Sequence, residues 1–110
     1  DMAPDLVPAA VRLAHLMTAD GKGRRAAGIL EKAWISGPHP EIAREYLNAK
    51  GVTDALGGVK AMEKLAKSNP EHAESHLALA QAALEAELEK IKASVAELER
   101  IKASVGSLDE

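Results

Sequence analysis

The segment VPAAVRLAHLMTADGKGRRAAGILEKAWISGPHP, residues 7–40, predicts two antiparallel helices joined by a tight turn. Small side chains at Ala14 and Ala33 let helix backbones approach each other closely. Gly21 lies between the two apolar-periodic stretches and can adopt the positive φ that reverses the chain. Pro38 cannot continue a helix, so it ends the second stretch. The segment is therefore expected to form a helical hairpin.

This spacing resembles the tetratricopeptide repeat, a helix-turn-helix unit of about 34 residues. If Val7 is the first repeat position, the eighth, twentieth and twenty-seventh positions are Ala14, Ala26 and Ala33. A second, degenerate repeat follows, in which Pro70 aligns with Pro38, and a third begins at Ala73. The resemblance implies an all-α, tetratricopeptide-like solenoid fragment that binds other proteins or peptides.

Capping and breaking residues predict five helices. Their approximate bounds are Leu6–Ala19, Gly23–Ser36, Glu41–Ala49, Asp54–Lys67 and Glu71–Val105. Asp5 and Thr53 are the expected N-caps of the first and fourth helices, and Pro70 is expected to open the last. Gly57 and Gly58 are poor helix formers, which indicates a close helix crossing at that point.

Composition excludes several functional classes. The 110 residues contain no Cys and carry a formal charge of −3, so thiolate chemistry and a basic nucleic-acid surface are both excluded. No apolar run approaches the roughly 20 residues that cross a bilayer. No nucleophile elbow or phosphate-binding glycine loop is present. We therefore expect no enzyme activity, no cofactor, no nucleic-acid partner and no membrane contact by this fragment.

The end of the chain carries a duplicated decapeptide. ELEKIKASVA, residues 87–96, is followed by ELERIKASVG, residues 97–106. An apolar stripe runs along it and consists of Leu84, Leu88, Ile91, Val95, Leu98, Ile101 and Val105. Its spacing matches a heptad as far as Leu98, and the three-residue step to Ile101 then overwinds a left-handed coil. The pattern predicts a repeat region over 1–86 and a continuous, coiled-coil-like helix over 87–110 that drives homo-oligomerisation.

The resemblance to the repeat also implies where a protein partner would bind. Its concave groove would be lined here by Arg12, His15, Glu45, Tyr46 and Gln81. Leu79, Ala83 and Ala86 would face the position of a missing second helix of the third repeat. That terminal face has no polar cap, so a second molecule or further chain is expected to cover it.

A longer resemblance covers residues 5–86. DLVPAAVRLAHLM (5–17), RRAAGILEKAWISGPHPEIAREYL (24–47) and KAMEKLAKSNPEHAESHLALAQAALEA (60–86) are similar to the C-terminal tetratricopeptide region of the HemY family of proteobacterial inner-membrane proteins. The resemblance implies a soluble fragment of a protein anchored in the inner membrane. That family continues with another turn and helix, but here the resemblance stops at Glu87. We therefore expect residues 87–110 to be a separate helix, natural or designed, that is fused to a natural fragment.

An alternative function is a haem-handling or metal-binding accessory domain. His72 and His76 are four residues apart, a spacing that can present two imidazoles to one metal ion. His15 and Met17 form the only candidate pair of haem ligands. Two ligands make a weak signal, and we expect these histidines, with His39 in its Pro-His-Pro turn, to pack or to cap helices.

Overall fold

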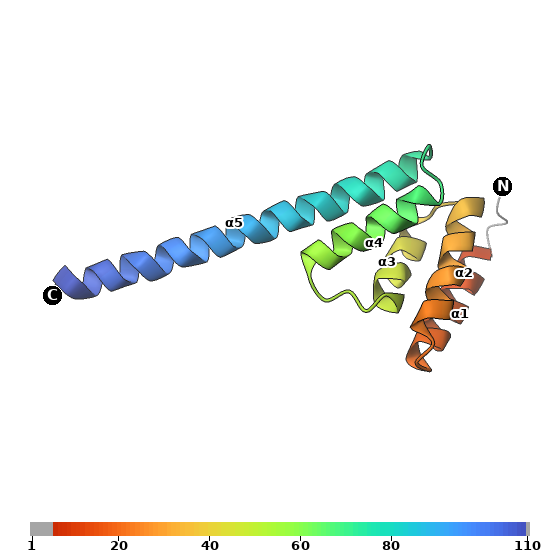
Figure 1. Ribbon diagram of the computed structural model, residues 1–110, viewed down its shortest axis with the longest axis horizontal. Helices are drawn as coiled ribbons and strands as arrows, with labels where there is room; N and C mark the ends of the chain where they lie inside the picture. The colour runs from red at the N-terminus through yellow and green to blue at the C-terminus, as the bar shows by residue number, and fades with distance from the viewer. Residues whose placement is uncertain (1–5, 110) are drawn as a thin grey trace.

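The computed structural model describes residues 6–109, and within that range the chain folds into five helices and no strand. The helices are α1 (Leu6–Ala19), α2 (Gly23–Ser36), α3 (Pro40–Ala49), α4 (Ala55–Lys67) and α5 (Ala73–Asp109). Figure 1 shows α1 to α4 gathered at one end of α5. The predicted all-α fold with a long last helix is confirmed, and α1 and α2 have the predicted bounds. The predicted cap Asp5 lies outside the described residues.

Two helix starts differ from the prediction. Asp54, not Thr53, caps α4, because its Oδ1 accepts the Gly57 N–H at 2.9 Å. The last helix does not open at Pro70 but begins at Ala73, after a turn in which His72 Nδ1 accepts the Glu74 N–H at 3.0 Å. In both cases a side chain satisfies a backbone N–H that the first helical turn leaves free.

The turns use glycine as expected, but the close helix crossing lies elsewhere. Gly21 has a φ of 79°, the left-handed conformation predicted for the first turn. At Gly57 an added Cβ would meet only the capping Asp54 and Val52 side chains, and at Gly58 it would meet nothing within 4 Å, so the prediction of a crossing there was wrong. The close approach occurs at Gly23, where a Cβ would lie 2.6 Å from the Ala49 carbonyl oxygen.

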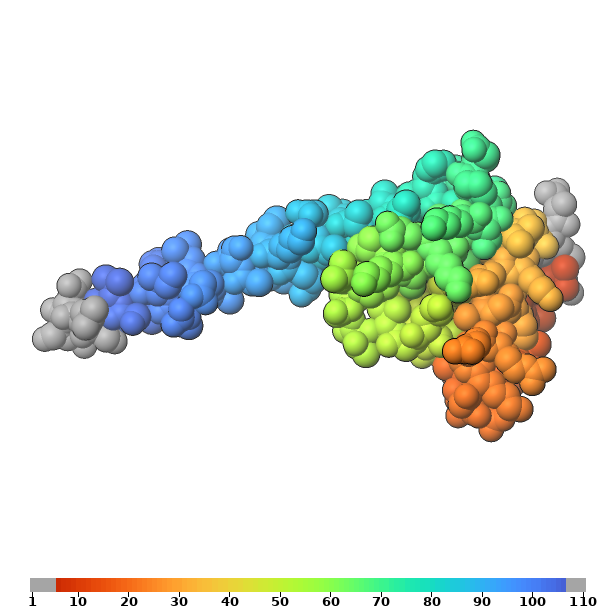
Figure 2. Space-filling model, in the orientation of Figure 1, coloured from red at the N-terminus to blue at the C-terminus, as the bar shows by residue number. Residues whose placement is uncertain are grey.

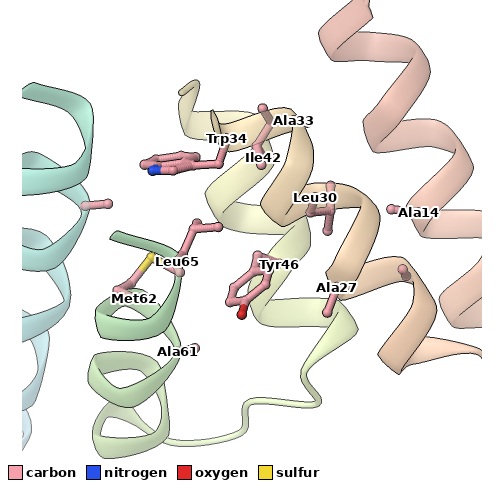
Figure 3. Packing of buried hydrophobic residues seen from close by; sticks show 12 residues of the cluster. Ala14, Ala27, Leu30, Ala33, Trp34, Ile42, Tyr46, Ala61, Met62 and Leu65 are labelled. Atoms are coloured by element: carbon pink, nitrogen blue, oxygen red, sulfur yellow. The ribbon is translucent and has the colours of Figure 1, made fainter. Parts of the chain in front are cut away.

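The core joins the first hairpin to the helices that follow. The α1–α2 hairpin packs on α3, and α4 packs on α5. Ala14 and Ala26 have no exposed surface and Ala33 is also buried, so small side chains do stand at the hairpin contacts. The labelled residues in Figure 3 show how the larger side chains of α2, α3 and α4 fill the space between these helices: Leu30, Trp34, Ile42, Tyr46, Met62 and Leu65.

A buried hydrogen-bond network ties α2 to the start of α5. Trp34 donates its indole N–H to Ser75 Oγ at 2.8 Å, and Ser75 donates to the Asn69 carbonyl oxygen at 2.6 Å. The Asn69 amide in turn lies 3.4 Å from the Trp34 carbonyl oxygen and 3.3 Å from that of Ile35. The network fixes the direction in which α5 leaves the four shorter helices.

We call α1 to α4, together with the part of α5 that packs on them, the body. The molecule measures 67 × 33 × 20 Å, and Figure 2 shows the C-terminal half of α5 standing clear of the body. Every residue from Glu87 to Gly106 is exposed. Between residues 73 and 106, where burial is described, Ala86 is the last partly buried residue of α5, so the exposed extension begins at residue 87.

Candidate functional site

The most extensive candidate surface is a row of apolar side chains along α5. These residues form what we call the α5 stripe, and they are Leu84, Leu88, Ile91, Val95, Leu98, Ile101 and Val105. Their exposed fractions run from 41% at Leu88 to 70% at Leu84. Single exposed apolar residues are ordinary on protein surfaces, but a contiguous row of this length is typical of an interaction site.

The α5 stripe points away from the body. Ser75 and Ala82 lie on the side of α5 that packs on the body, where Ser75 is 1% exposed. Leu84 follows Ser75 by nine residues, and Ile91 follows Ala82 by nine. At about 100° per residue, nine residues are two and a half turns, so Leu84 and Ile91 face the side of the helix opposite to the body. The stripe is therefore accessible along its whole length.

Charged residues flank the α5 stripe and pair along the helix. Lys90 Nζ lies 3.4 Å from Glu87, and Lys92 Nζ lies 3.6 Å from Glu89. Arg100 Nε donates to Glu97 at 3.1 Å, and this hydrogen bond lowers the pKa of the Glu97 carboxyl. These pairs between residues three apart support the helix. They leave the apolar side chains uncovered.

The predicted partner groove is only partly assembled. His15 Nδ1 lies 3.3 Å from the Glu45 carboxylate, and Asn48 donates to the same carboxylate at 2.7 Å. Arg12 is exposed nearby on α1, whereas Gln81 is exposed on α5. The structure thus joins His15 and Glu45, from α1 and α3, into one polar cluster.

Tyr46 does not belong to that surface. Its side chain is fully buried, so its prediction as a groove residue was wrong. The hydroxyl donates to Glu31 Oε2 at 2.6 Å, and Lys64 lies 3.9 Å from the same oxygen. Burial, with the hydrogen bond to Glu31, raises the pKa of Tyr46 well above its ordinary value. A helix-period pattern locates a residue on a face but does not distinguish the edge of a groove from the core beneath it.

A second apolar hollow lies on the other side of α5. It has a volume of about 1030 Å³ and is formed where the start of α4 diverges from α5. Leu56 and Val59 line it from α4, and Ala83 and Ala86 line it from α5. Two of the three residues predicted to face a missing helix, Ala83 and Ala86, thus line the hollow, whereas the third, Leu79, packs against the core. No stripe residue lines it, so a helix placed there would leave the α5 stripe exposed.

Three of the four histidines act at helix starts or at the α1–α3 contact, and the fourth, His76, is exposed on α5. His39 Nδ1 accepts the Glu41 N–H at 3.1 Å and caps α3, as His72 caps α5. His15 pairs with Glu45, as described above. Across residues 6–109, no three His, Asp or Glu side chains gather closely enough to hold one metal ion. Nor is any helix in that range long and apolar enough to cross a membrane.

Comparisons of the chain with models of known protein families, with curated proteins and with solved structures found no match. The function is therefore argued from the surfaces of this chain alone.

Proposed function

We propose that this chain is a protein-association module that self-associates through the α5 stripe. The observation that supports the proposal is the position of the stripe, on a helix segment that stands clear of the body and on the face turned away from it. Within residues 6–109 no other part of the chain covers these side chains. A partner helix can.

The energetic argument rests on burial. Fully burying a Leu, Ile or Val side chain is worth about 1.5–3 kcal/mol relative to leaving it in water. Seven such side chains in one row can offset the translational and rotational freedom that association costs, which is estimated at about 4–15 kcal/mol. A row flanked by charged residues on both sides is also the arrangement found in coiled coils.

For the body we propose a tetratricopeptide-like scaffold, as its resemblance to that repeat implies. Its support is the stacking of α1, α2 and α3 through Ala14, Ala26 and Ala33, all of them buried. In this account a protein or peptide partner binds the exposed residues Arg12, His15 and Gln81, together with Glu45, whose side chain is 12% exposed.

The experiment compares matched single substitutions by light scattering. Leu98→Asp places a charge in the α5 stripe, and Ala96→Asp places the same charge on an exposed position almost opposite to it. We expect Leu98→Asp to give monomers of 11.6 kDa and Ala96→Asp to assemble like the wild type. Equal assembly of all three proteins would overturn the proposal.

A third variant tests the competing apolar surface. Leu13 and Leu16 are 49% and 54% exposed on α1, so α1 also offers a place for self-association. Leu13→Asp should leave the oligomer intact. If it yields monomers while Leu98→Asp does not, α1 and not α5 carries the association.

A further inference from the structure

Two residues directly beside the α5 stripe, Glu87 and Lys92, carry opposite charges on its two flanks. Glu87 precedes Leu88 by one residue, and Lys92 follows Ile91 by one. At about 100° per residue, Glu87 and Lys92 are about 140° apart with the stripe between them. At this point of the stripe a glutamate therefore lies on one flank and a lysine on the other.

The duplicated decapeptide repeats this arrangement of charges about the stripe ten residues later. Glu97 and Lys102 stand in the same relation to Leu98 and Ile101 as Glu87 and Lys92 do to the first pair of stripe residues. The overwound spacing turns the stripe gradually around the helix, and the flanking charges turn with it. The glutamate and the lysine of each pair consequently keep the same sides of the stripe from Glu87 to Lys102.

The orientation of a partner helix decides which charges meet. In a parallel pair, the flank before the stripe on one helix faces the flank after the stripe on the other, so Glu87 approaches the partner's Lys92 and Glu97 approaches the partner's Lys102. In an antiparallel pair one helix is reversed, so its glutamate flank and its lysine flank change places relative to the partner helix. Glutamates then face glutamates and lysines face lysines, an arrangement that like charges disfavour.

The body leaves room for the parallel arrangement. It packs on the side of α5 that carries Ser75 and Ala82, which is opposite to the stripe. Helices that meet along their stripes therefore hold their bodies on the outside of the bundle. Within the described chain, Glu87 and Glu97 have only exposed partners three residues away, and Lys102 has no ion-pair partner, so these side chains can reach a neighbouring helix.

We infer that the ligand of the α5 stripe is the α5 stripe of a second copy of this chain, bound parallel and in register. This inference rests on the self-association proposed above and adds its direction and the residues that select it. Glu87 with Glu97 and Lys92 with Lys102 act as the specificity determinants.

Disulfide trapping tests the direction. The chain has no Cys, so Leu84→Cys and Val105→Cys each introduce a single thiol at one end of the stripe. These positions are about 32 Å apart at 1.5 Å per residue, far beyond the roughly 7 Å between Cα atoms that a disulfide spans. In the parallel arrangement each variant alone forms a covalent dimer on mild oxidation, and a mixture forms no cross-linked heterodimer.

Two other outcomes would overturn the inference. A heterodimer that forms only when the two variants are mixed would show an antiparallel pair. An oligomer by sedimentation that forms no disulfide in any combination would show that the stripes are not in register. A monomer by sedimentation would instead refute the proposed self-association itself, so the two failures are distinguishable.

Charge reversal tests the determinants independently. Glu87→Lys with Glu97→Lys should weaken self-association by about tenfold or more, and Lys92→Glu with Lys102→Glu should do the same, because each places like charges across a parallel interface. Mixing the two double variants should restore assembly as a heteromer. Glu63→Lys with Glu71→Lys is the control, since it makes the same charge change at exposed positions away from the stripe and should associate like the wild type. If the first two double variants associate as strongly as this control, the proposed charge selection is wrong.

Discussion

Trp34 of α2 donates its indole N–H to Ser75 Oγ of α5, 41 residues later in the chain, at 2.8 Å. Both side chains are buried, and the Ser75 hydroxyl in turn donates a hydrogen bond to the Asn69 carbonyl oxygen. This contact joins the hairpin to the long helix. It therefore determines how the α5 stripe is oriented relative to the body.

Ser75→Ala should destabilise the folded chain by about 1–3 kcal/mol, because it leaves a buried indole N–H without an acceptor. Urea denaturation measures the loss. Ser94→Ala is the control, since Ser94 is an exposed serine of the same helix and its replacement gains the same helix propensity without breaking this network. Equal stability of the two variants would mean that the network contributes nothing.

Two glycines should respond oppositely to the same substitution. Gly23→Ala should be destabilising, because the new Cβ would lie 2.6 Å from the backbone oxygen of Ala49. Gly58→Ala should stabilise by about 0.5–1 kcal/mol, because alanine favours the helix and its Cβ meets nothing within 4 Å. Thermal unfolding of both variants checks the prediction, and a stabilising Gly23→Ala would contradict the close approach of α2 and α3.

Tyr46 should make the protein sensitive to alkaline pH. Its pKa is raised in the folded state, chiefly by burial, so above about pH 10 the unfolded chain loses the tyrosine proton while the folded chain keeps it. Stability should therefore fall as pH rises beyond that value. Because Tyr46 is the only tyrosine, tyrosinate absorbance should appear together with unfolding.

The control for this prediction is Tyr46→Phe. It should show a smaller loss of stability between pH 9 and about pH 11, since no phenol ionises in its unfolded state. Tyrosinate absorbance that appears near pH 10 in the fully folded wild type would contradict the burial of this hydroxyl.

Much of the fold could be predicted from local signals. The bounds of α1 and α2, the positive φ of Gly21 and the burial of Ala14, Ala26 and Ala33 all follow from turn chemistry and helical periodicity. The long last helix follows from the absence of Gly and Pro between Pro70 and Gly106. Each of these features depends on residues close together in the chain.

Features that depend on tertiary contacts could not be predicted in the same way. Gly23 approaches Ala49 of another helix, and nothing in the sequence near Gly23 signals that neighbour. Tyr46 faces inward to Glu31, although its repeat position suggested the groove. Ser75 was missed as well. Its only local signal is a small polar residue on the face of α5 that also carries the buried Ala78.

The candidate site also has one feature that the sequence predicts and one that it does not. The stripe residues were visible as a pattern, because they lie on one helix. Their orientation away from the body was not, since it depends on which face of α5 the other helices cover.

Sedimentation equilibrium of the unmodified chain between about 1 and 100 μM, a range on the order of common protein affinities, tests self-association most directly. The account predicts a mass that is a multiple of 11.6 kDa and that falls toward the monomer on dilution. A single species of 11.6 kDa at every concentration would contradict it.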